Sequence, residues 1–82
     1  MSKSVFTERY NRFRQLLIKA RQASKLTQAE LSTKLSRPQS YVSKYERGER
    51  RLDLIEFLEI VEALQVEPET FIKKLLEEKE EN

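Results

Sequence analysis

The chain has 82 residues, of which 38% are hydrophobic and 37% are charged, as suits one small globular domain. It contains no Cys and no His, which excludes disulfides, thiol or imidazole catalysis and the usual metal sites. We therefore expect neither an enzyme nor a bound cofactor. One Gly and two Pro argue against a turn-rich β fold and favour helices joined by short connections.

The net charge of +2 hides a division along the chain. Residues 1–51 hold 13 Lys and Arg against 4 Asp and Glu, whereas residues 52–82 hold 3 against 10. A basic half favours a polyanionic partner, although charges that merely solvate helix faces explain this asymmetry equally well. No apolar run approaches the roughly 20 residues of a membrane span, and no signal-peptide pattern is present. We expect a cytoplasmic protein without membrane contact.

Hydrophobic periodicity predicts five helices, of which the first runs from about Thr7 to about Ala23. Its apolar residues recur every three or four positions, so they form one stripe. The stripe consists of Phe6, Tyr10, Phe13, Leu17 and Ala20. A capping box formed by Thr27 and Glu30 begins a short second helix, which ends near Leu35.

Pro38 and Gly48 set the limits of the third predicted helix. Pro38 fits the first turn of a helix and disfavours helical backbone at the residue before it, so the second and third helices are separate. Val42 and Tyr45 lie three positions apart and are expected to face inward. Gly48 suits a left-handed C-cap. Residues 27–48 are therefore predicted to be two short helices with a tight connection.

The acidic half of the sequence predicts two further helices. A capping box of Asp53 and Glu56 begins the fourth helix, and Leu52 and Phe57 have the spacing of a hydrophobic staple. Its expected buried residues are Leu54, Phe57, Leu58, Val61 and Leu64. Pro68 begins the fifth helix, which carries Phe71, Ile72, Leu75 and Leu76. With residues 77–82 as a charged tail, we expect residues 1–82 to form one all-α domain.

Two short helices in this arrangement are typical of a helix-turn-helix, which places its second helix in the major groove of DNA. That helix must face solvent on one side and carry groups that pair with base edges. With Val42 and Tyr45 inward, the residues facing outward are Gln39, Ser40, Ser43, Lys44 and Arg47. The amide, hydroxyl and ammonium groups of the first four suit base contacts.

Contacts with the DNA backbone are expected from residues around this helix. Gln28 lies in the first turn of the second predicted helix, where free N–H groups and the helix dipole attract a phosphate. Arg50 and Arg51 follow the turn at the end of the third helix. Arg37 in the connection and Arg47 at the helix end complete the predicted backbone contacts.

At these residues the chain resembles the lambda-repressor/Cro-like family of helix-turn-helix transcription regulators of bacteria and phages, also called the XRE family. The resemblance covers about residues 13–72. It is carried by the segments LTQAELSTKL (26–35), SRPQSYVSKYERG (36–48) and EALQV (62–66). It implies a compact five-helix domain that binds the major groove of double-stranded DNA.

The resemblance also implies roles for individual residues. Gln28 would contact a phosphate, and the base-facing residues would be Gln39, Ser40 and Lys44, with Ser43 between them. An ion pair between Arg21 and Glu46 would orient the recognition helix without contacting DNA.

Three residues depart from the family's pattern. Ser36 replaces the usual Gly of the turn, Ser32 replaces a small Ala at the helix crossing, and Arg37 stands where an apolar residue is common. A left-handed Ser36 would cost about 1–2 kcal/mol. The sequence leaves two roles for Tyr41, which either contacts DNA or covers the neighbouring helix.

The fifth predicted helix has more apolar residues than one small core needs. We expect Phe71, Ile72, Leu75 and Leu76 to include a subunit contact, which makes a homodimer on a palindromic operator the favoured function. Such a bacterial or phage regulator would associate with the nucleoid when bound, and without an effector domain it would sense no small molecule. The alternative is an antitoxin-like or anti-repressor-like module that binds another protein through residues 4–12.

Overall fold

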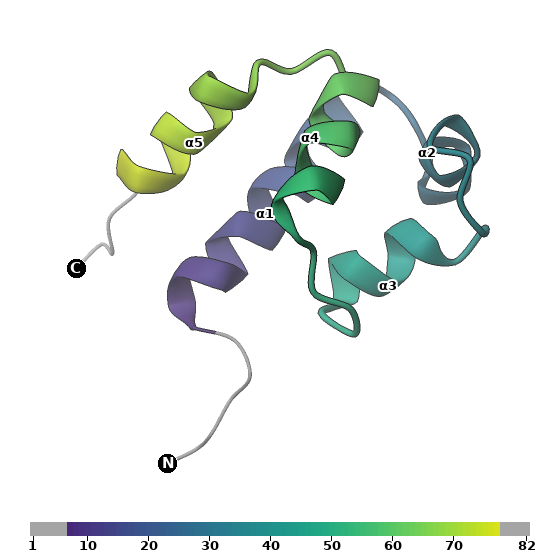
Figure 1. Ribbon diagram of the computed structural model, residues 1–82, viewed down its shortest axis with the longest axis horizontal. Helices are drawn as coiled ribbons and strands as arrows, with labels where there is room; N and C mark the ends of the chain where they lie inside the picture. Colours follow the sequence, from purple (N-terminus) through teal and green to yellow (C-terminus); the bar gives the residue numbers. More distant parts are fainter. Residues whose placement is uncertain (1–6, 78–82) are drawn as a thin grey trace.

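The computed structural model describes residues 7–77, which fold into five α-helices with no strand (Figure 1). The helices are α1 (Glu8–Ala23), α2 (Gln28–Lys34), α3 (Tyr41–Arg47), α4 (Leu54–Ala63) and α5 (Pro68–Glu77). The predicted all-α, five-helix fold is confirmed. Residue Phe6, the segment 4–6 of the expected protein contact and the tail residues 78–82 lie outside the described residues.

Side-chain caps begin three of these helices where the sequence predicts them. The Thr7 hydroxyl accepts a hydrogen bond from the Tyr10 N–H and caps α1. The capping boxes at the starts of α2 and α4 are both complete, with reciprocal side-chain and backbone hydrogen bonds. Such caps satisfy N–H groups that a helix leaves without an internal partner.

Each of the first four helices is followed, within two residues of its last residue, by one residue with left-handed backbone. These residues are Lys25, Ser36, Gly48 and Gln65, with φ of 61°, 59°, 84° and 60°. In each case the N–H of the next residue donates to the carbonyl five positions earlier, as in a Schellman motif. Only one of the four is a glycine, so the other three side chains are placed in backbone that costs about 1–2 kcal/mol for a residue with a Cβ.

α3 begins at Tyr41, so the prediction that Pro38 lies in its first turn is wrong. Pro38 instead begins a turn, in which the Tyr41 N–H donates to the Pro38 carbonyl at 2.9 Å. Gln39 and Ser40 therefore lie in the turn before the helix. The difference arises because Ser40 provides no side-chain cap, and an N–H near the start of α3 finds its acceptor on another helix.

That acceptor is Ser32 of α2, whose side chain is fully buried. Its Oγ accepts a hydrogen bond from the Val42 N–H at 3.1 Å, and its carbonyl accepts one from the Arg37 N–H at 2.9 Å. One residue of α2 thus fixes both the turn and the first turn of α3. The serine that departs from the family's usual alanine supplies a contact that alanine lacks.

The core lies where α1 packs against α3 and α5 and where α4 closes the remaining side (Figure 1). Phe13, Phe57 and Phe71 form an aromatic cluster with ring centroids 5.1 to 5.9 Å apart. One expectation for α4 is wrong, because Leu54 is 64% exposed. Ile60, which was not among the expected buried residues, is fully buried. Leu54 is the first residue of α4 and lines a surface groove with Ile72 and Leu75 of α5.

We expect Ser32→Ala to lower the free energy of unfolding by about 1–3 kcal/mol, because the buried Val42 N–H would lose its acceptor. Urea denaturation followed by circular dichroism measures this change. Thr33→Ala, at an exposed position of the same helix, is the control and should stay within about 0.5 kcal/mol of the wild type. Equal stability of the two variants would contradict the assigned role of Ser32.

Candidate nucleic-acid interface

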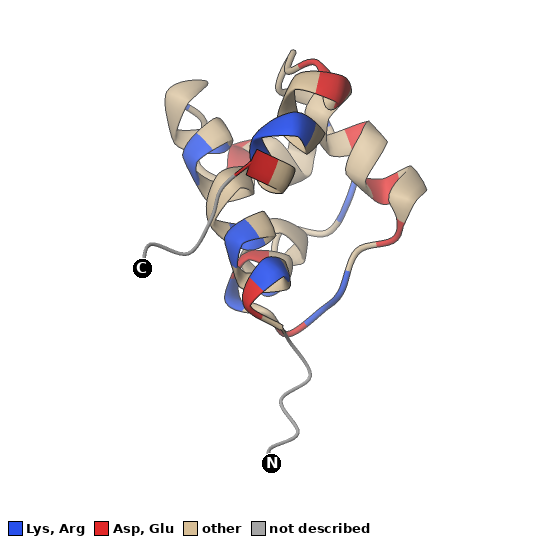
Figure 2. Cartoon of the chain, turned by 90° about the vertical axis from the view of Figure 1, so that its left-hand side faces the viewer, with Lys and Arg blue, Asp and Glu red and all other residues tan. Residues whose placement is uncertain are grey.

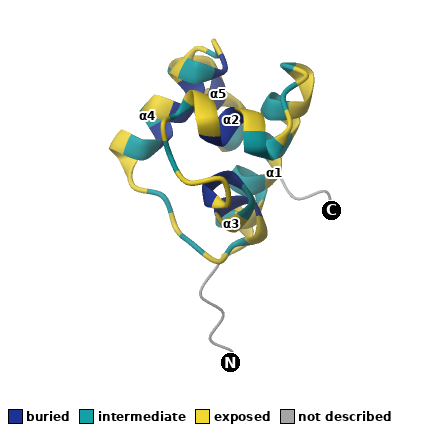
Figure 3. Ribbon diagram, turned by 90° about the vertical axis from the view of Figure 1, so that its right-hand side faces the viewer, coloured by how far each residue is buried: buried dark blue, intermediate teal, exposed yellow. Residues whose placement is uncertain are grey.

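The residues predicted to contact bases lie together at the start of α3 and in the turn before it. Gln39, Ser40 and Lys44 are exposed, whereas Ser43 is partly buried and its hydroxyl donates to the Ser40 carbonyl at 3.1 Å. A shallow hollow of about 330 Å³ separates this surface from the start of α2, and Gln28 and Ala29 line its other side. Along both α2 and α3, buried and exposed segments alternate (Figure 3).

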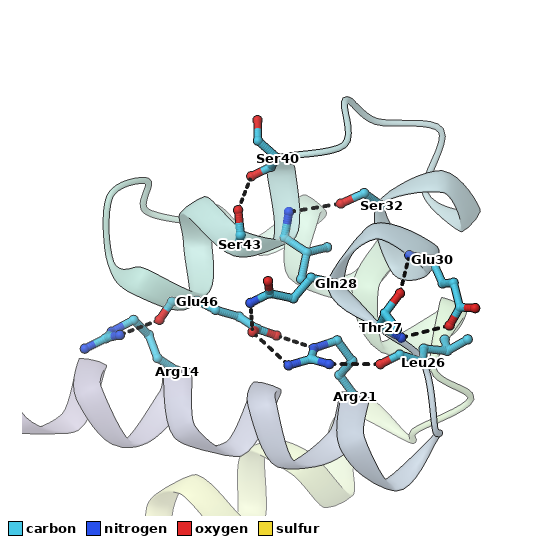
Figure 4. A network of polar contacts seen from close by, with 11 residues as sticks. Arg14, Arg21, Leu26, Thr27, Gln28, Glu30, Ser32, Ser40, Ser43 and Glu46 are labelled. Atoms are coloured by element: carbon cyan, nitrogen blue, oxygen red, sulfur yellow. Dashed lines mark hydrogen bonds and ion pairs between the residues drawn. The ribbon is translucent and has the colours of Figure 1, made fainter.

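The orientation of α3 is fixed by Glu46, whose side chain is only 4% exposed. Arg21 of α1 donates from Nε to Glu46 Oε2 at 2.8 Å and from a terminal nitrogen to Oε1 at 3.1 Å. The same guanidinium also donates to the Leu26 carbonyl at 2.9 Å. Arg14, which lies seven positions before Arg21 in α1, donates to the Glu46 carbonyl (Figure 4). The predicted partners Arg21 and Glu46 therefore form an ion pair within a larger polar network.

Gln28 belongs to this network, which the sequence did not indicate. Its Nε2 donates to Glu46 Oε1 at 2.8 Å, and its side chain is partly buried (Figure 4). A primary amide carries two hydrogens, so this contact leaves a second donor on the same nitrogen. The predicted phosphate-binding residue is thus held by the same carboxylate that orients α3.

Three of the predicted backbone-contacting arginines are each paired with a carboxylate. Arg37 lies 3.0 Å from Glu59 and 4.0 Å from Glu56, and Arg50 lies 2.8 Å from Glu56. Arg47 binds Glu49 at 2.9 Å. Basic and acidic segments alternate along the connection between α3 and α4 (Figure 2). The sequence pattern showed the cations but gave no means of pairing them with particular carboxylates.

Tyr41 packs against the protein, which is the second of the two roles that the sequence left open, a DNA contact being the first. It is 6% exposed, and its ring stands edge-on to Tyr45 with centroids 5.5 Å apart. The guanidinium carbons of Arg37 and Arg50 lie 4.8 and 5.2 Å from the centre of its ring. Burial is the main cause that raises the pKa of Tyr41 above its usual value.

Glu56 joins these arginines to the start of α4. Its side chain accepts two hydrogen bonds from Arg50 and one from the Asp53 N–H of the capping box. The hydrogen bonds from Arg50, followed by the one from the backbone, lower the pKa of Glu56 to about 2. Arg51, the remaining predicted backbone contact, places its guanidinium carbon 4.2 Å from the centre of the Tyr10 ring.

The apolar residues expected at a subunit contact divide between core and surface. Phe71 is 4% exposed and packs in the core, so its inclusion in that contact is wrong. Ile72 and Leu76 are 41% and 58% exposed, and Leu75 is partly buried. The start of α4 adds two exposed apolar residues that were not predicted for such a contact, Leu54 and Ile55.

Residues 7–77 have neither a metal-binding cluster nor a membrane-spanning helix. This part of the chain has no group of three or more Asp, Glu, His or Cys side chains that could hold a metal ion. None of its helices is both long and apolar enough to cross a bilayer.

Two short helices joined by a tight turn, with exposed polar residues in and just before the second, are the arrangement of a helix-turn-helix DNA-binding domain. A helix-turn-helix family model matches residues 17–71. Among solved structures, an "XRE-family like protein" from Pseudomonas syringae pv. tomato str. DC3000 is 46% identical, with a TM-score of 0.80 over 83% of each chain. The comparison with curated proteins gives no match. The chain belongs to the XRE family of helix-turn-helix DNA-binding regulators.

We expect Glu46→Gln to lower the free energy of unfolding by about 2–4 kcal/mol, because it leaves Arg21 without its counter-charge in a mostly buried site. Replacing both residues, as in Arg21→Gln with Glu46→Gln, should cost less than the two single changes combined. Urea denaturation of all three variants gives the comparison. Glu62→Gln, at an exposed residue of α4, is the control, and additive single effects would contradict a direct interaction.

Proposed function

We propose that this protein is a transcription regulator that binds a palindromic operator as a homodimer, with one α3 in the major groove of each half-site. The carrying observation is the exposed row of Gln39, Ser40 and Lys44 beside a helix held by the Glu46 network. Side chains that read bases must be held in a fixed orientation, and a network that joins three helices supplies this. The two half-sites would lie about 34–36 Å apart along the duplex.

Base contacts are assigned to Gln39, Ser40, Ser43 and Lys44. The amide of Gln39 suits adenine, and the ammonium group of Lys44 suits the O6 and N7 atoms of guanine. Lys44 is exposed and forms no salt bridge with another residue in the part of the chain that the structure describes. Its charge is therefore available to an acceptor in the groove.

Backbone contacts are assigned to Gln28, Arg37, Arg47, Arg50 and Arg51. Gln28 borders the hollow beside the base-reading row and has a second amide hydrogen for a phosphate oxygen. Three of the arginines hold carboxylates in the free protein, so each would share or exchange that partner on binding. These contacts would supply sequence-independent affinity.

The subunit contact is assigned to an apolar patch formed by Leu54, Ile55, Ile72, Leu75 and Leu76. The patch combines the start of α4 with one side of α5, and a groove of about 190 Å³ runs between them. A second copy of the chain is its proposed occupant, since one small module buries too little surface for tight operator binding. A dimer in the bacterial cytoplasm would present two recognition helices to the nucleoid.

The proposal is tested by selecting bound duplexes from a random pool with the full-length protein. An enriched inverted repeat is the expected result, and its spacing reports the dimer geometry. If no sequence is enriched and binding to any duplex is weak even at low salt, the protein-binding module is the better interpretation. Binding through several phosphates should weaken steeply as salt rises.

We expect Lys44→Ala to relax the preference at one base position of the selected half-site, with a loss of about 1–3 kcal/mol of discrimination there. Competition binding against single-base variants of the half-site measures this. Thr33→Ala, which changes an exposed residue outside the base-reading row, should leave the preference intact. A uniform loss of affinity for every sequence would instead move Lys44 to the DNA backbone.

We expect Leu54→Lys and Leu76→Lys each to shift the protein from dimer to monomer, because each places a charge in the apolar patch. Sedimentation equilibrium measures the shift over a range of concentrations, and circular dichroism checks that the fold is kept. Glu77→Lys adds a lysine beside the patch in the same turn of α5 and should leave the dimer intact. A wild-type protein that is monomeric both alone and with operator DNA would overturn the dimer.

A further inference from the structure

The arginine pairs around α3 are of two kinds. Arg50 and Arg37 share Glu56, which also caps α4, and both guanidinium groups stack on the buried Tyr41. These pairs join three elements, so releasing them would disturb the fold. Among the residues that the structure describes, the pair of Arg47 with Glu49 has no such ties beyond its own segment.

Arg47 and Glu49 lie on either side of Gly48, where α3 ends. The Nε of Arg47 donates to Glu49 Oε2 at 2.9 Å, and a terminal nitrogen donates to Oε1 at 3.0 Å. The Glu49 N–H donates to the Lys44 carbonyl at 2.9 Å, which holds the carboxylate beside the recognition helix. The two side chains are 54% and 53% exposed, so solvent reaches both. The geometry is that of a two-pronged contact open to competition.

The electrostatic effects agree with this geometry. The hydrogen bonds from Arg47 hold the pKa of the Glu49 carboxyl below its usual value, and the charges of Arg47 and Lys44 act in the same direction. Glu49 is therefore ionised at neutral pH and lies in the field of two cations of the proposed DNA-binding surface. A phosphate offers an arginine fork the same pair of oxygens as a carboxylate.

We propose that Glu49 is an internal competitor for DNA phosphate at Arg47. This inference rests on the proposed function. The residues assigned above provide affinity for DNA, whereas Glu49 limits it. In the free protein Glu49 fills the guanidinium fork, so phosphate binding at Arg47 exchanges one anion for another. Because the exchange involves no base, Glu49 lowers affinity for operator and non-operator DNA alike.

The test is a double-mutant cycle on DNA affinity, using wild type, Glu49→Gln, Arg47→Gln and the double variant. The probe is a fluorescein-labelled duplex of mixed sequence, about 30 base pairs long, at about 50 mM salt, with fluorescence anisotropy as the readout. Glu49→Gln should bind about twofold to fivefold more tightly than wild type, as expected for an exposed ion pair. When Arg47 is already Gln, the gain in affinity from Glu49→Gln should fall to nearly none.

A matched variant controls for the simple loss of a negative charge. Glu62→Gln removes the same charge from an exposed residue of α4 and should change affinity less than Glu49→Gln. The inference is overturned if Glu49→Gln binds no more tightly than wild type, or if its gain is the same with and without Arg47. The second result would assign the effect to Lys44 or to net charge. If the wild type binds no duplex at any salt concentration, the proposed function itself fails.

Discussion

The Glu46 carboxylate is the constraint on which the placement of α3, the proposed recognition helix, depends. A carboxylate that is 4% exposed loses nearly all of its hydration, and Arg21 of α1 and Gln28 of α2 replace it. Because hydrogen bonds depend on direction, this network fixes the rotation of α3 about its axis as well as its distance from α1 and α2. Apolar packing of Val42 and Tyr45 alone would tolerate more variation in that angle.

α3 is held from its other side by a second polar assembly. Tyr41 lies under the guanidinium groups of Arg37 and Arg50, which bind Glu56 at the first turn of α4. The start of α4 also carries Leu54, the most exposed residue of the proposed subunit patch. The surface proposed to read bases and the surface proposed to join subunits are therefore connected through a few charged side chains. This connection would give the two recognition helices of a dimer a defined separation.

The helices were predictable because their start signals are local. The capping boxes beginning at Thr27 and Asp53 depend on residues three positions apart, and the structure has both. The start of α3 was predicted wrongly because its N–H partner is Ser32, ten residues before Val42 and on another helix. The pairing of Arg50 with Glu56 and of Arg37 with Glu59 escaped prediction for a similar reason. A sequence pattern shows which charges exist, but their partners depend on how the helices pack.

Lys25, Ser36 and Gln65, the residues with left-handed backbone that follow α1, α2 and α4, have a consequence for the evolution of this chain. A β-carbon is unfavourable in such backbone, so glycine at any of these positions would relieve a local strain. The greater entropy that glycine gives the unfolded chain offsets part of this gain in stability. Homologues with glycine there would tolerate harmful changes elsewhere, including new side chains on the groove-facing surface. Substitution by glycine after these helices, outside the row assigned to base recognition, would thus add stability. That stability could offset the cost of substitutions that alter operator preference, so the fold would be kept.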